Sequence, residues 1–224
     1  MKDSLNIAIA GATGYIGIEL VKILSNHPKV KIKYLCAKKS IGKSIFLFSK
    51  KIKKQKLPKI SKIQNILWKD IDVIFTALPN GEAQNIASKI PDHITLIDLS
   101  ADFRLNNSNK YKKWYGIKHK NKKKIKDSIY AITEFSRNKL NKFKIISCPG
   151  CYPTSVQLPL LPLINKKAIK VDNIIVDSKS GYSGAGKNIK KKFKFKNLFD
   201  SVSAYGVGHH RHMPEIDQEL SKIS

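Results

Sequence analysis

The chain has 224 residues, of which 42% are hydrophobic, so it can form one large domain or two small ones around a sizeable core. Lys and Arg outnumber Asp and Glu by 43 to 16, which gives a formal net charge of +27. No window holds about 18 uncharged apolar residues, so no membrane span is expected, and the first residues lack the apolar stretch of a secretory signal. Three cysteines argue against a disulfide framework and favour a reducing, cytoplasmic setting.

The positive charge raises the question of a nucleic-acid partner. Only three of the 43 basic residues are Arg, although base recognition and two-pronged phosphate contacts favour that side chain. Three lysine-rich clusters, at residues 50–56, 118–126 and 190–196, are separated along the chain. We therefore favour a solvated lysine surface without a specific nucleic-acid site. A basic nucleic-acid-binding protein built on the same scaffold remains the alternative.

The expected strands are short apolar runs, as buried parallel strands are. They are residues 5–10, 31–36, 72–78, 95–99, 144–147 and 174–178, and the expected helices between them are residues 14–26, 81–90 and 153–164. Pro159 and Pro162 are expected to kink or shorten the last helix. Residues 38–66 are expected to form a loop with a short strand, and residues 106–127 a polar loop. The alternation predicts an α/β fold with a doubly wound sheet.

The first motif is a glycine-rich loop, Gly11-Ala-Thr-Gly14-Tyr-Ile-Gly17, between the first strand and the first helix. Glycine lets the backbone approach a pyrophosphate, and the start of a helix offers free N–H groups. The spacing is GxxGxxG and not the GxGxxG fingerprint, so a tight turn that serves packing alone is the alternative. The position between strand and helix favours dinucleotide binding.

The residues after the second strand bear on the choice of cofactor. NAD enzymes usually have Asp or Glu there to bind the ribose hydroxyls. Here the stretch is Cys36-Ala-Lys-Lys-Ser40, with cations and a hydroxyl and no acid. The missing acid therefore favours NADP(H), whose 2′-phosphate needs positive partners.

The second motif is Cys148-Pro-Gly-Cys151-Tyr-Pro-Thr154, between an expected strand and an expected helix. A thiol at the start of a helix faces the positive end of the dipole, which favours the reactive thiolate. An inert buried cysteine and a CxxC redox pair are alternatives. A metal site is not expected, because the chain has no second CxxC and no His at paired ligand spacing. We favour Cys151 as a nucleophile.

Two further motifs lie towards the C-terminus. Residues 180–186 form a glycine and hydroxyl loop that suits oxygen-rich groups. Residues 208–216 place His209, His210, Arg211 and His212 in four successive positions. A histidine of near-neutral pKa can activate a thiol and protonate an alkoxide. The alternative is a polar loop of solvated histidines without a catalytic role.

Together these motifs resemble the N-acetyl-gamma-glutamyl-phosphate reductase family of arginine biosynthesis. The matching segments are GATGYIGIEL (11–20), LPNGEA (78–83), IDLSADFRL (97–105), IYAITEF (129–135), CPGCYPTS (148–155), SGYSGAGK (180–187) and AYGVGHHRHMPEI (204–216). The resemblance implies an oxidoreductase, a semialdehyde dehydrogenase that uses NADP(H), an acyl phosphate or semialdehyde and phosphate. It implies a Rossmann-type NADP-binding domain at residues 1–147, and at residues 148–224 an incomplete α+β catalytic domain like that of aspartate-semialdehyde and glyceraldehyde-3-phosphate dehydrogenases.

The resemblance also implies roles for single residues. It makes Cys151 the nucleophile and His210 the general acid/base. The implied substrate-binding residues are Arg104, Ser180, Gly181 and His212. The implied cofactor-binding residues are Gly11, Thr13, Gly14, Tyr15, Ile16, Gly17, Ser40, Pro79 and Asn80.

The sequence departs from the family in two respects. Cys148 stands where the family usually has Asn, so a Cys148–Cys151 disulfide is a possible inactivating link. Family members are also about half as long again. We therefore expect a truncated catalytic domain and, for the full-length protein, a homo-oligomer (dimer or tetramer). The rival hypotheses are a dehydrogenase of the aspartate-semialdehyde type and an inactive truncated remnant.

Overall fold

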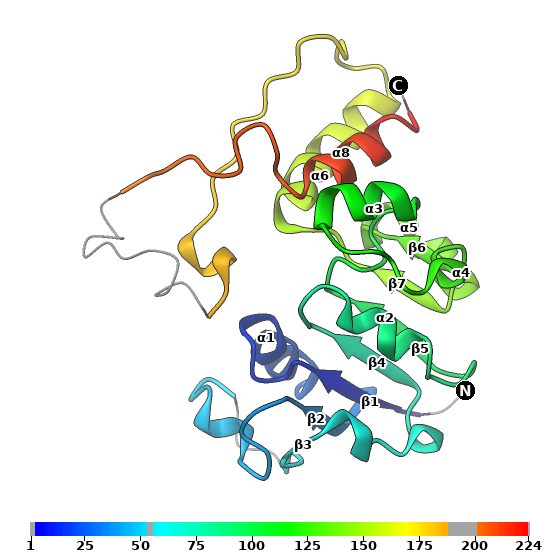
Figure 1. Ribbon diagram of the computed structural model, residues 1–224, viewed down its shortest axis with the longest axis vertical. Coiled ribbons are helices and arrows are strands. Elements are labelled where there is room, and N and C mark those ends of the chain that lie inside the picture. Colours follow the sequence, from blue (N-terminus) through cyan, green and yellow to red (C-terminus); the bar gives the residue numbers. More distant parts are fainter. Residues whose placement is uncertain (1–2, 53–55, 188–200, 224) are drawn as a thin grey trace.

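The structure is a computed structural model that describes residues 3–52, 56–187 and 201–223 (Figure 1). Its centre is a seven-stranded sheet in which every neighbouring pair is parallel, in the order β3-β2-β1-β4-β5-β7-β6. The strands are β1 (Leu5–Ala10), β2 (Val30–Cys36), β3 (Ile60–Ser61), β4 (Val73–Thr76), β5 (Thr95–Asp98), β6 (Ser128–Tyr130) and β7 (Ile145–Ser147). The predicted doubly wound sheet is confirmed.

Helices cover both faces of this sheet because successive side chains of a strand point to opposite faces. On one face, Ile7 and Ile9 of β1 pack with Val21 of α1 (Tyr15–Leu24) in one buried cluster. On the other face, alanines of β1 pack in a second cluster with Ile86 of α2 (Glu82–Ala87). Both faces are therefore dry, which explains why the strands read as continuous apolar runs.

The carboxyl ends of the central strands lie at one edge of the sheet. The loops after β1, β4, β5 and β7 all leave from that edge, because the strands are parallel. The order of strands reverses between β1 and β4, which is the switch point where doubly wound sheets bind their ligands. The sequence motifs at residues 11–17, 78–83, 97–105 and 148–155 therefore share one edge.

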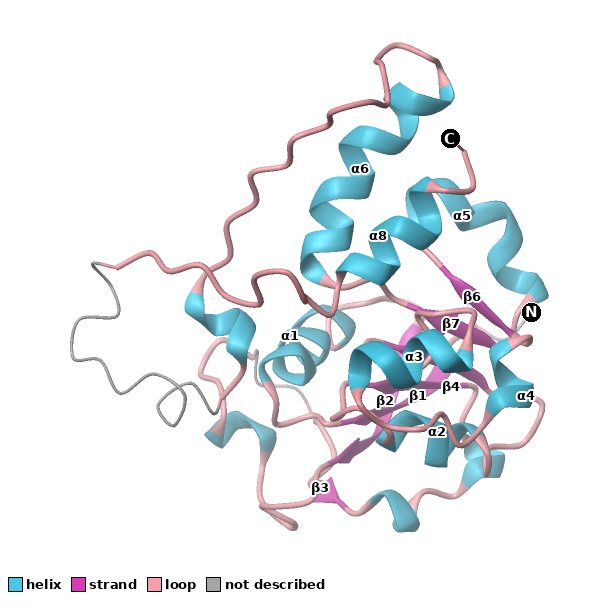
Figure 2. Cartoon of the chain, turned by 45° about the horizontal axis from the view of Figure 1, so that its top comes forward, coloured by secondary structure: helices cyan, strands magenta, loops and turns pink. Residues whose placement is uncertain are grey.

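Two helices lie beyond this edge, side by side in both views (Figures 1 and 2). They are α6 (Cys151–Asn165) and α8 (Met213–Leu220). Pro159 and Pro162 were predicted to kink or shorten this helix; they do not shorten it, since α6 runs through both. Proline removes the bond to the carbonyl four residues earlier, here those of Ser155 and Leu158. Ser155 and Leu158 are both exposed, so water can hydrogen-bond to these carbonyl groups.

The predicted strand at residues 174–178 was also wrong. The segment is irregular and exposed, and the side chain of Ile175 is 93% accessible. Within the described residues no neighbouring strand pairs with it. A strand needs such a neighbour to satisfy its backbone N–H and C=O groups, so the apolar run alone does not make one.

Residues 106–127 were expected to form a loop and instead contain α3 (Ser108–Tyr115) and α4 (Lys122–Ile125). The side chain of Asn107 caps α3 by accepting from the N–H of Lys110 at 3.0 Å. Gly116 ends the helix at a left-handed φ of +74°. The remaining short elements are α5 (Thr133–Ser136) and 3₁₀ turns at Ile45–Leu47, Ile63–Asn65, Trp68–Asp70, Arg137–Lys142 and Tyr182–Ala185.

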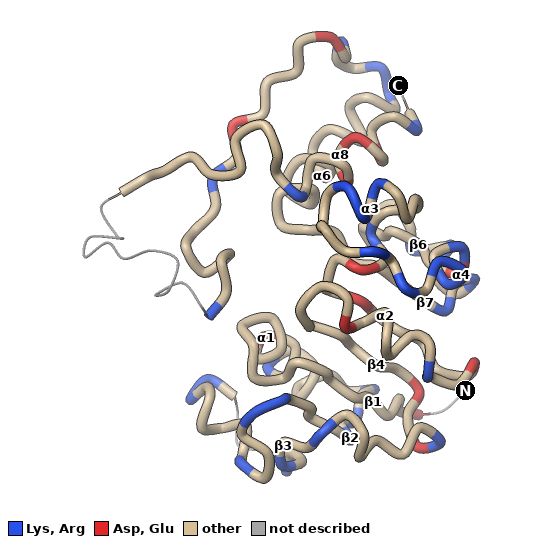
Figure 3. The backbone as a smooth tube through the Cα atoms, viewed as in Figure 1, with Lys and Arg blue, Asp and Glu red and all other residues tan. Residues whose placement is uncertain are grey.

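Basic residues occur on separate elements of the described chain, including α3, α4 and the region of β2 and β3 (Figure 3). This distribution fits a solvated lysine surface. The predicted cluster at residues 190–196 lies outside the described residues. Among the residues that the structure does describe, no helix is long and apolar enough to span a bilayer.

Candidate active site

The glycine-rich loop is a tight turn between β1 and α1. Gly11 has a φ of +88°, and a Cβ there would lie 2.2 Å from the carbonyl oxygen of Ala77 in the next loop. A Cβ on Gly17 would lie 2.1 Å from the carbonyl oxygen of Gly11. Both glycines are therefore required by backbone packing, whatever else the loop binds. This close packing brings the loop against the end of β4.

The start of α1 carries backbone donors that have no acceptor among the described residues. Gly14 is the N-cap and supplies no side-chain hydrogen bond. Within the described part of the chain, the N–H groups of Thr13, Tyr15 and Ile16 have no acceptor. Free N–H groups at a helix start attract phosphate oxygens, so this loop fits a dinucleotide pyrophosphate.

The end of β2 carries the residues predicted to favour NADP(H). Lys38 forms an ion pair with Glu82 at 2.6 Å, so its charge is partly committed. Lys39 is exposed, and Ser40 has a left-handed φ of +67° that turns the chain beyond the strand. Neither Asp nor Glu follows β2 within these residues, and Lys39 and Ser40 fit a ribose phosphate.

Asp102 holds the loop that contains Pro79 and Asn80, and sequence reasoning gave Asp102 no role. Its buried carboxylate accepts from the N–H of Gly81 at 2.7 Å and from that of Ala83 at 2.9 Å. It thereby caps α2 from a different part of the chain. The only signal in the sequence was an acid inside an apolar motif.

Cys151 is exposed and is the first residue of α6, at the carboxyl edge of the sheet. Cys148, three residues earlier, is partly buried, and its N–H donates to the carbonyl oxygen of Asp98 at 2.7 Å. Burial and the charge of Asp98 raise the pKa of Cys148 to about 11. At neutral pH the Cys148 thiol therefore stays protonated, which leaves Cys151 as the accessible nucleophile of the pair.

Two histidines of the C-terminal motif lie beside the thiol segment. The rings of His210 and His212 are 4.8 Å apart, and that of His210 is 5.3 Å from the ring of Tyr152. A Cβ on Gly150 would lie 2.4 Å from Nε2 of His212, so this imidazole packs directly on the residue before Cys151. The third histidine, His209, lies elsewhere.

The protonation of these histidines follows from burial and from arginine charges. Burial and Arg104 lower the pKa of His212 to about 3, so its ring is neutral. Burial and Arg211 also lower the pKa of His210. A neutral imidazole can accept a proton, which a general base needs. Arg211 is exposed, and sequence reasoning gave it no separate role.

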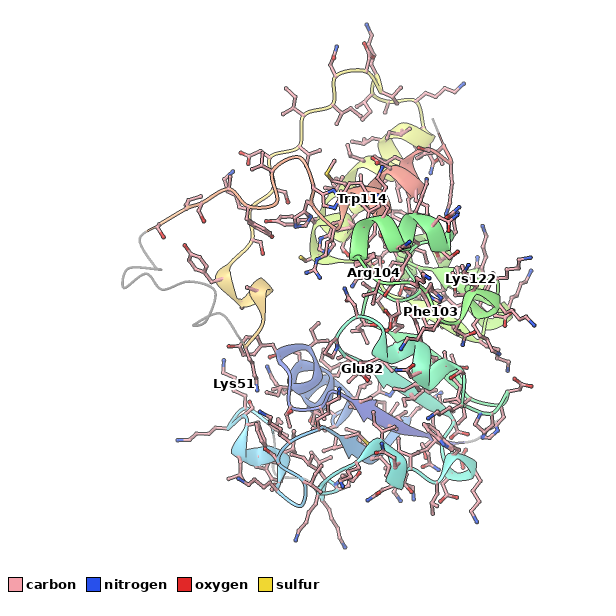
Figure 4. All side chains as sticks on the ribbon, in the orientation of Figure 1. Lys51, Glu82, Phe103, Arg104, Trp114 and Lys122 are labelled. Carbon is pink, nitrogen blue, oxygen red and sulfur yellow. The ribbon has the colours of Figure 1, made fainter. Side chains whose placement is uncertain are left out.

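Arg104, predicted to bind substrate, donates to protein oxygens in this structure. Its side chain is only 10% accessible, and all three guanidinium nitrogens donate to protein oxygens. The acceptors are the carbonyl oxygens of Cys148 and Leu99, at 2.9 and 3.2 Å, and Glu215, at 3.1 Å. A two-pronged contact with substrate would require breaking these bonds. Figure 4 shows Arg104 and Trp114 at the level of α3.

Ser180 and Gly181 lie in an exposed loop whose hydrogen bonds stay largely local. The structure does not bring them into contact with Cys151 among the described residues. The same motif ends at Lys187, whose ammonium bonds to the carbonyl oxygen of Thr13 and lies 5.6 Å from the ring centre of Tyr15. The motif therefore adjoins the glycine-rich loop in this structure.

No group of three or more His, Cys, Asp or Glu side chains in the described ranges is arranged to hold a metal ion. The site is thus built from a thiol, imidazoles, arginines and backbone N–H groups. Such a set suits nucleophilic chemistry on a carbonyl group, with an anionic ligand nearby.

Residues 6–143 match the family model described as the semialdehyde dehydrogenase NAD-binding domain, and residues 151–224 match the semialdehyde dehydrogenase dimerisation domain. The chain belongs to the semialdehyde dehydrogenase family. Its NAD-binding domain contains the glycine-rich loop, and its dimerisation domain begins at Cys151. The family-level prediction of an α/β semialdehyde dehydrogenase fold is therefore confirmed.

Curated relatives match nearly the whole chain. A protein of Ehrlichia canis named N-acetyl-gamma-glutamyl-phosphate reductase is 44% identical over 98% of this chain and 64% of its own length. A rice protein named probable N-acetyl-gamma-glutamyl-phosphate reductase, chloroplastic, is 40% identical over 99% of this chain and 54% of its own length. The chain thus spans between about half and two thirds of these relatives. They confirm the resemblance drawn from the motifs.

Solved structures support the fold. Aspartate semialdehyde dehydrogenase II of Vibrio cholerae, complexed with ASA, aligns with a TM-score of 0.64 at 16% identity, covering 98% of this chain and 66% of that chain. The aspartate semialdehyde dehydrogenase of Candida albicans, with NADP, aligns with a TM-score of 0.51 at 19% identity, covering 73% and 47%. At these identities the likeness concerns the fold.

Proposed function

We propose that this chain provides the dinucleotide site and the thiol of an NADP-dependent N-acetyl-gamma-glutamyl-phosphate reductase. The reaction reduces N-acetyl-gamma-glutamyl phosphate to N-acetylglutamate 5-semialdehyde and releases phosphate. The observation that carries the proposal is the exposed Cys151 thiol at the start of α6, next to the uncharged imidazole of His212 and close to His210. The names of the curated relatives support the choice of substrate.

The first step is acylation of Cys151. The thiolate attacks the acyl carbonyl carbon, a carbon–sulfur bond forms, and the carbon–oxygen bond to phosphate breaks with both electrons leaving on phosphate. Backbone N–H groups in the first turn of α6 are suited to hold the negative oxygen of the tetrahedral intermediate. The product is a thioester on Cys151.

The second step reduces the thioester. NADPH, when bound, supplies the hydride that turns the thioester into a thiohemiacetal alkoxide. His210, which takes the proton of the Cys151 thiol in the first step, donates that proton to the alkoxide oxygen, and collapse of the thiohemiacetal passes it to sulfur, which returns the thiol and releases the aldehyde. His212 is held neutral against Gly150, so we assign it a contact with the substrate and not the proton transfer.

We assign the cofactor to loops at the same carboxyl edge of the sheet. We assign the pyrophosphate to the N–H groups of the glycine-rich loop at residues 11–17 and the ribose phosphate to Lys39 and Ser40. The loop of Pro79 and Asn80, tied to Asp102, is assigned to the nicotinamide end. This division gives residues 1–147 to the cofactor and residues 148–224 to the chemistry.

The anionic groups of the substrate need a cation. Arg104 is committed to protein acceptors, whereas Arg211 is exposed and close enough to His210 and His212 to lower the pKa of both. We therefore propose Arg211 as the first cationic contact of the substrate carboxylate or phosphate. The predicted contacts by Arg104, Ser180 and Gly181 would require rearrangement of their present surroundings.

The direct test is to trap the acyl-enzyme. The chain is mixed with N-acetyl-gamma-glutamyl phosphate without dinucleotide, and the mass of the peptide containing Cys151 is measured in a single turnover. We expect an acyl group on Cys151 and one equivalent of phosphate, both lost in Cys151→Ser and retained in Cys148→Ser. Acylation that persists in Cys151→Ser would refute the assignment of the nucleophile. A parallel reaction with aspartyl phosphate separates this reductase from the aspartate-semialdehyde type.

We also propose a homo-oligomer and a cytoplasmic location. The match of residues 151–224 to a dimerisation domain supports the first. Apolar residues of this region are exposed and available for burial in an interface. Ile175 is 93% accessible and Val202 94%. Three free thiols support a reducing compartment. Light scattering and cell fractionation test these two points.

A further inference from the structure

The carboxylate of Glu215 is completely buried and joins four segments of the chain. Its Oε2 accepts from the N–H of Gly150 at 2.9 Å and from the hydroxyl of Tyr130 at 3.3 Å. Its Oε1 accepts from Arg104 at 3.1 Å and from the hydroxyl of Tyr115 at 3.4 Å. All four partners are donors, so the site is built for a carboxylate and not for an amide.

Arg104 and Glu215 bind the two ends of the segment of residues 148–150, which we call the thiol loop. Arg104 donates to the carbonyl oxygen of Cys148, and Glu215 accepts from the N–H of Gly150. The two side chains are also paired with each other, which satisfies the buried charges. The segment of three residues before Cys151 is therefore fixed from one side by an ion pair.

The contact with Gly150 bears directly on the thiol. Gly150 is the N-cap of α6, and its N–H has no other acceptor among the described residues. Glu215 also lies on α8, three residues after His212, whose Nε2 is 4.0 Å from Oε1. One carboxylate therefore links the start of α6 to the histidine motif.

We propose that Glu215 and Arg104 are positioning residues that keep the thiol of Cys151 and the imidazoles of His210 and His212 in a fixed mutual arrangement. This inference rests on the proposed function in taking Cys151 as the nucleophile. It assigns Arg104 to the thiol loop in place of the substrate. The cofactor residues are outside this cluster, so the pair acts on acylation and turnover and leaves dinucleotide affinity unchanged.

The test uses Glu215→Gln in the complete chain. A carboxamide must present its NH₂ group to a donor, either at Gly150 or at Arg104, so one contact of the pair is lost. The matched control is Asp217→Asn, an exposed acid on the same helix. Four quantities are measured: the thermal midpoint, the rate of Cys151 acetylation by acetyl phosphate, hydrogen exchange at the amide of Gly150, and the Michaelis constant for NADPH.

We expect acetylation in Glu215→Gln to fall roughly tenfold or more, the size of a lost hydrogen bond to a charged group. We expect the Gly150 amide to exchange faster and the Michaelis constant for NADPH to stay within about twofold of wild type, because the glycine-rich loop is untouched. Asp217→Asn should match wild type in all of these measurements. Wild-type acetylation and exchange in a folded Glu215→Gln would overturn the proposal.

Two further measurements keep the outcome decisive. Glu215→Asp retains the charge beside Arg104 but is too short to reach Gly150, so it should show the same losses if the glutamine variant does not fold. In the unsubstituted chain the Gly150 amide should be protected roughly tenfold or more over an unstructured amide, and its free exchange overturns the proposal without any variant. If the unsubstituted chain is never acylated, the proposed function fails. Hydrogen exchange at the Gly150 amide would still test the contact with Glu215.

Discussion

The contact between Gly150 and His212 gives a sharp prediction. In Gly150→Ala the new Cβ would lie 2.4 Å from Nε2 of His212 and 2.7 Å from two carbons of the same ring. Gly150 has a φ of −68°, so alanine meets no backbone strain there. The cost of the substitution is therefore steric, and the imidazole or the start of α6 must move.

The size of the effect follows from two opposing contributions. Forcing a methyl group into packed surroundings costs about 2–3 kcal/mol, near the upper end of overpacking. Replacing glycine by alanine restricts the unfolded chain and returns about 0.5–1 kcal/mol. The net loss is about 1–2.5 kcal/mol, which corresponds to roughly 2–10 °C in the thermal midpoint of a chain of this size.

Thermal unfolding followed by circular dichroism measures this loss, with Gly181→Ala as the control. A Cβ on Gly181 meets nothing closer than 3.9 Å and its φ is −68°, so that variant should gain roughly 1–4 °C. In the background of His212→Ala, which removes the ring, Gly150→Ala should no longer destabilise. Equal midpoints for Gly150→Ala and wild type would refute the packing of His212 on Gly150.

Three further predictions concern other parts of the molecule. Gly11→Ala combines a left-handed φ with a contact of 2.2 Å to the carbonyl oxygen of Ala77, so urea unfolding should show a loss of about 2–5 kcal/mol. His212 has its folded-state pKa lowered to about 3 from 6.5, so only the unfolded chain gains its proton as pH falls below 6.5, and stability is lost. Relative to His212→Gln, the wild type should lose about 1 kcal/mol between pH 7 and 5, after discounting for the partly exposed ring; parallel pH profiles would contradict the neutral imidazole. Trp114 and His209 stack with ring centres 4.3 Å apart, so a double-mutant cycle of alanine substitutions should give a coupling of about 0.5–1.5 kcal/mol, and a zero coupling would exclude the stack.

The strongest sequence signals were those of buried strands next to a glycine turn. The first strand was predicted at residues 5–10 and is found at Leu5–Ala10, because both faces of a parallel strand must be apolar. The same rule failed at residues 174–178. An apolar run indicates only that its side chains favour burial. A strand also needs a neighbouring strand to hydrogen-bond its backbone N–H and C=O groups.

Local signals were partly overlooked in the polar stretch before β6. Helix α3 buries only Tyr111, so its apolar periodicity is weak, but Asn107 and Gly116 mark its two ends. For α6 the prolines outweighed the rest of the pattern in the prediction. Ser155 and Leu158, whose carbonyl groups lose the bond to these prolines, are exposed, and no sequence pattern reports this exposure directly.

The candidate site was predicted as a set of residues but not as an arrangement. The prediction of Cys151 as nucleophile followed from its motif, and that of His210 as general acid/base from the family resemblance. The burial of Arg104 did not, since an arginine next to an apolar strand can point either to a ligand or to protein carbonyls. Glu215 carries no signal of its own, and Asp102 only that of an acid inside an apolar motif, because their partners are backbone N–H groups and side chains distant in sequence.

The distances along the chain in the Glu215 cluster have a consequence for biosynthesis. Glu215 is 65 residues from Gly150 and 111 residues from Arg104, whereas all seven strands of the sheet lie before residue 148. During translation the sheet can therefore form while the thiol loop still lacks the carboxylate that holds it. Closure of α8 onto α6 is then expected as a late, long-range step of folding, and a nascent chain paused before that helix would lack the contact at Gly150 while Cys148 can already be bound by Arg104 and Asp98.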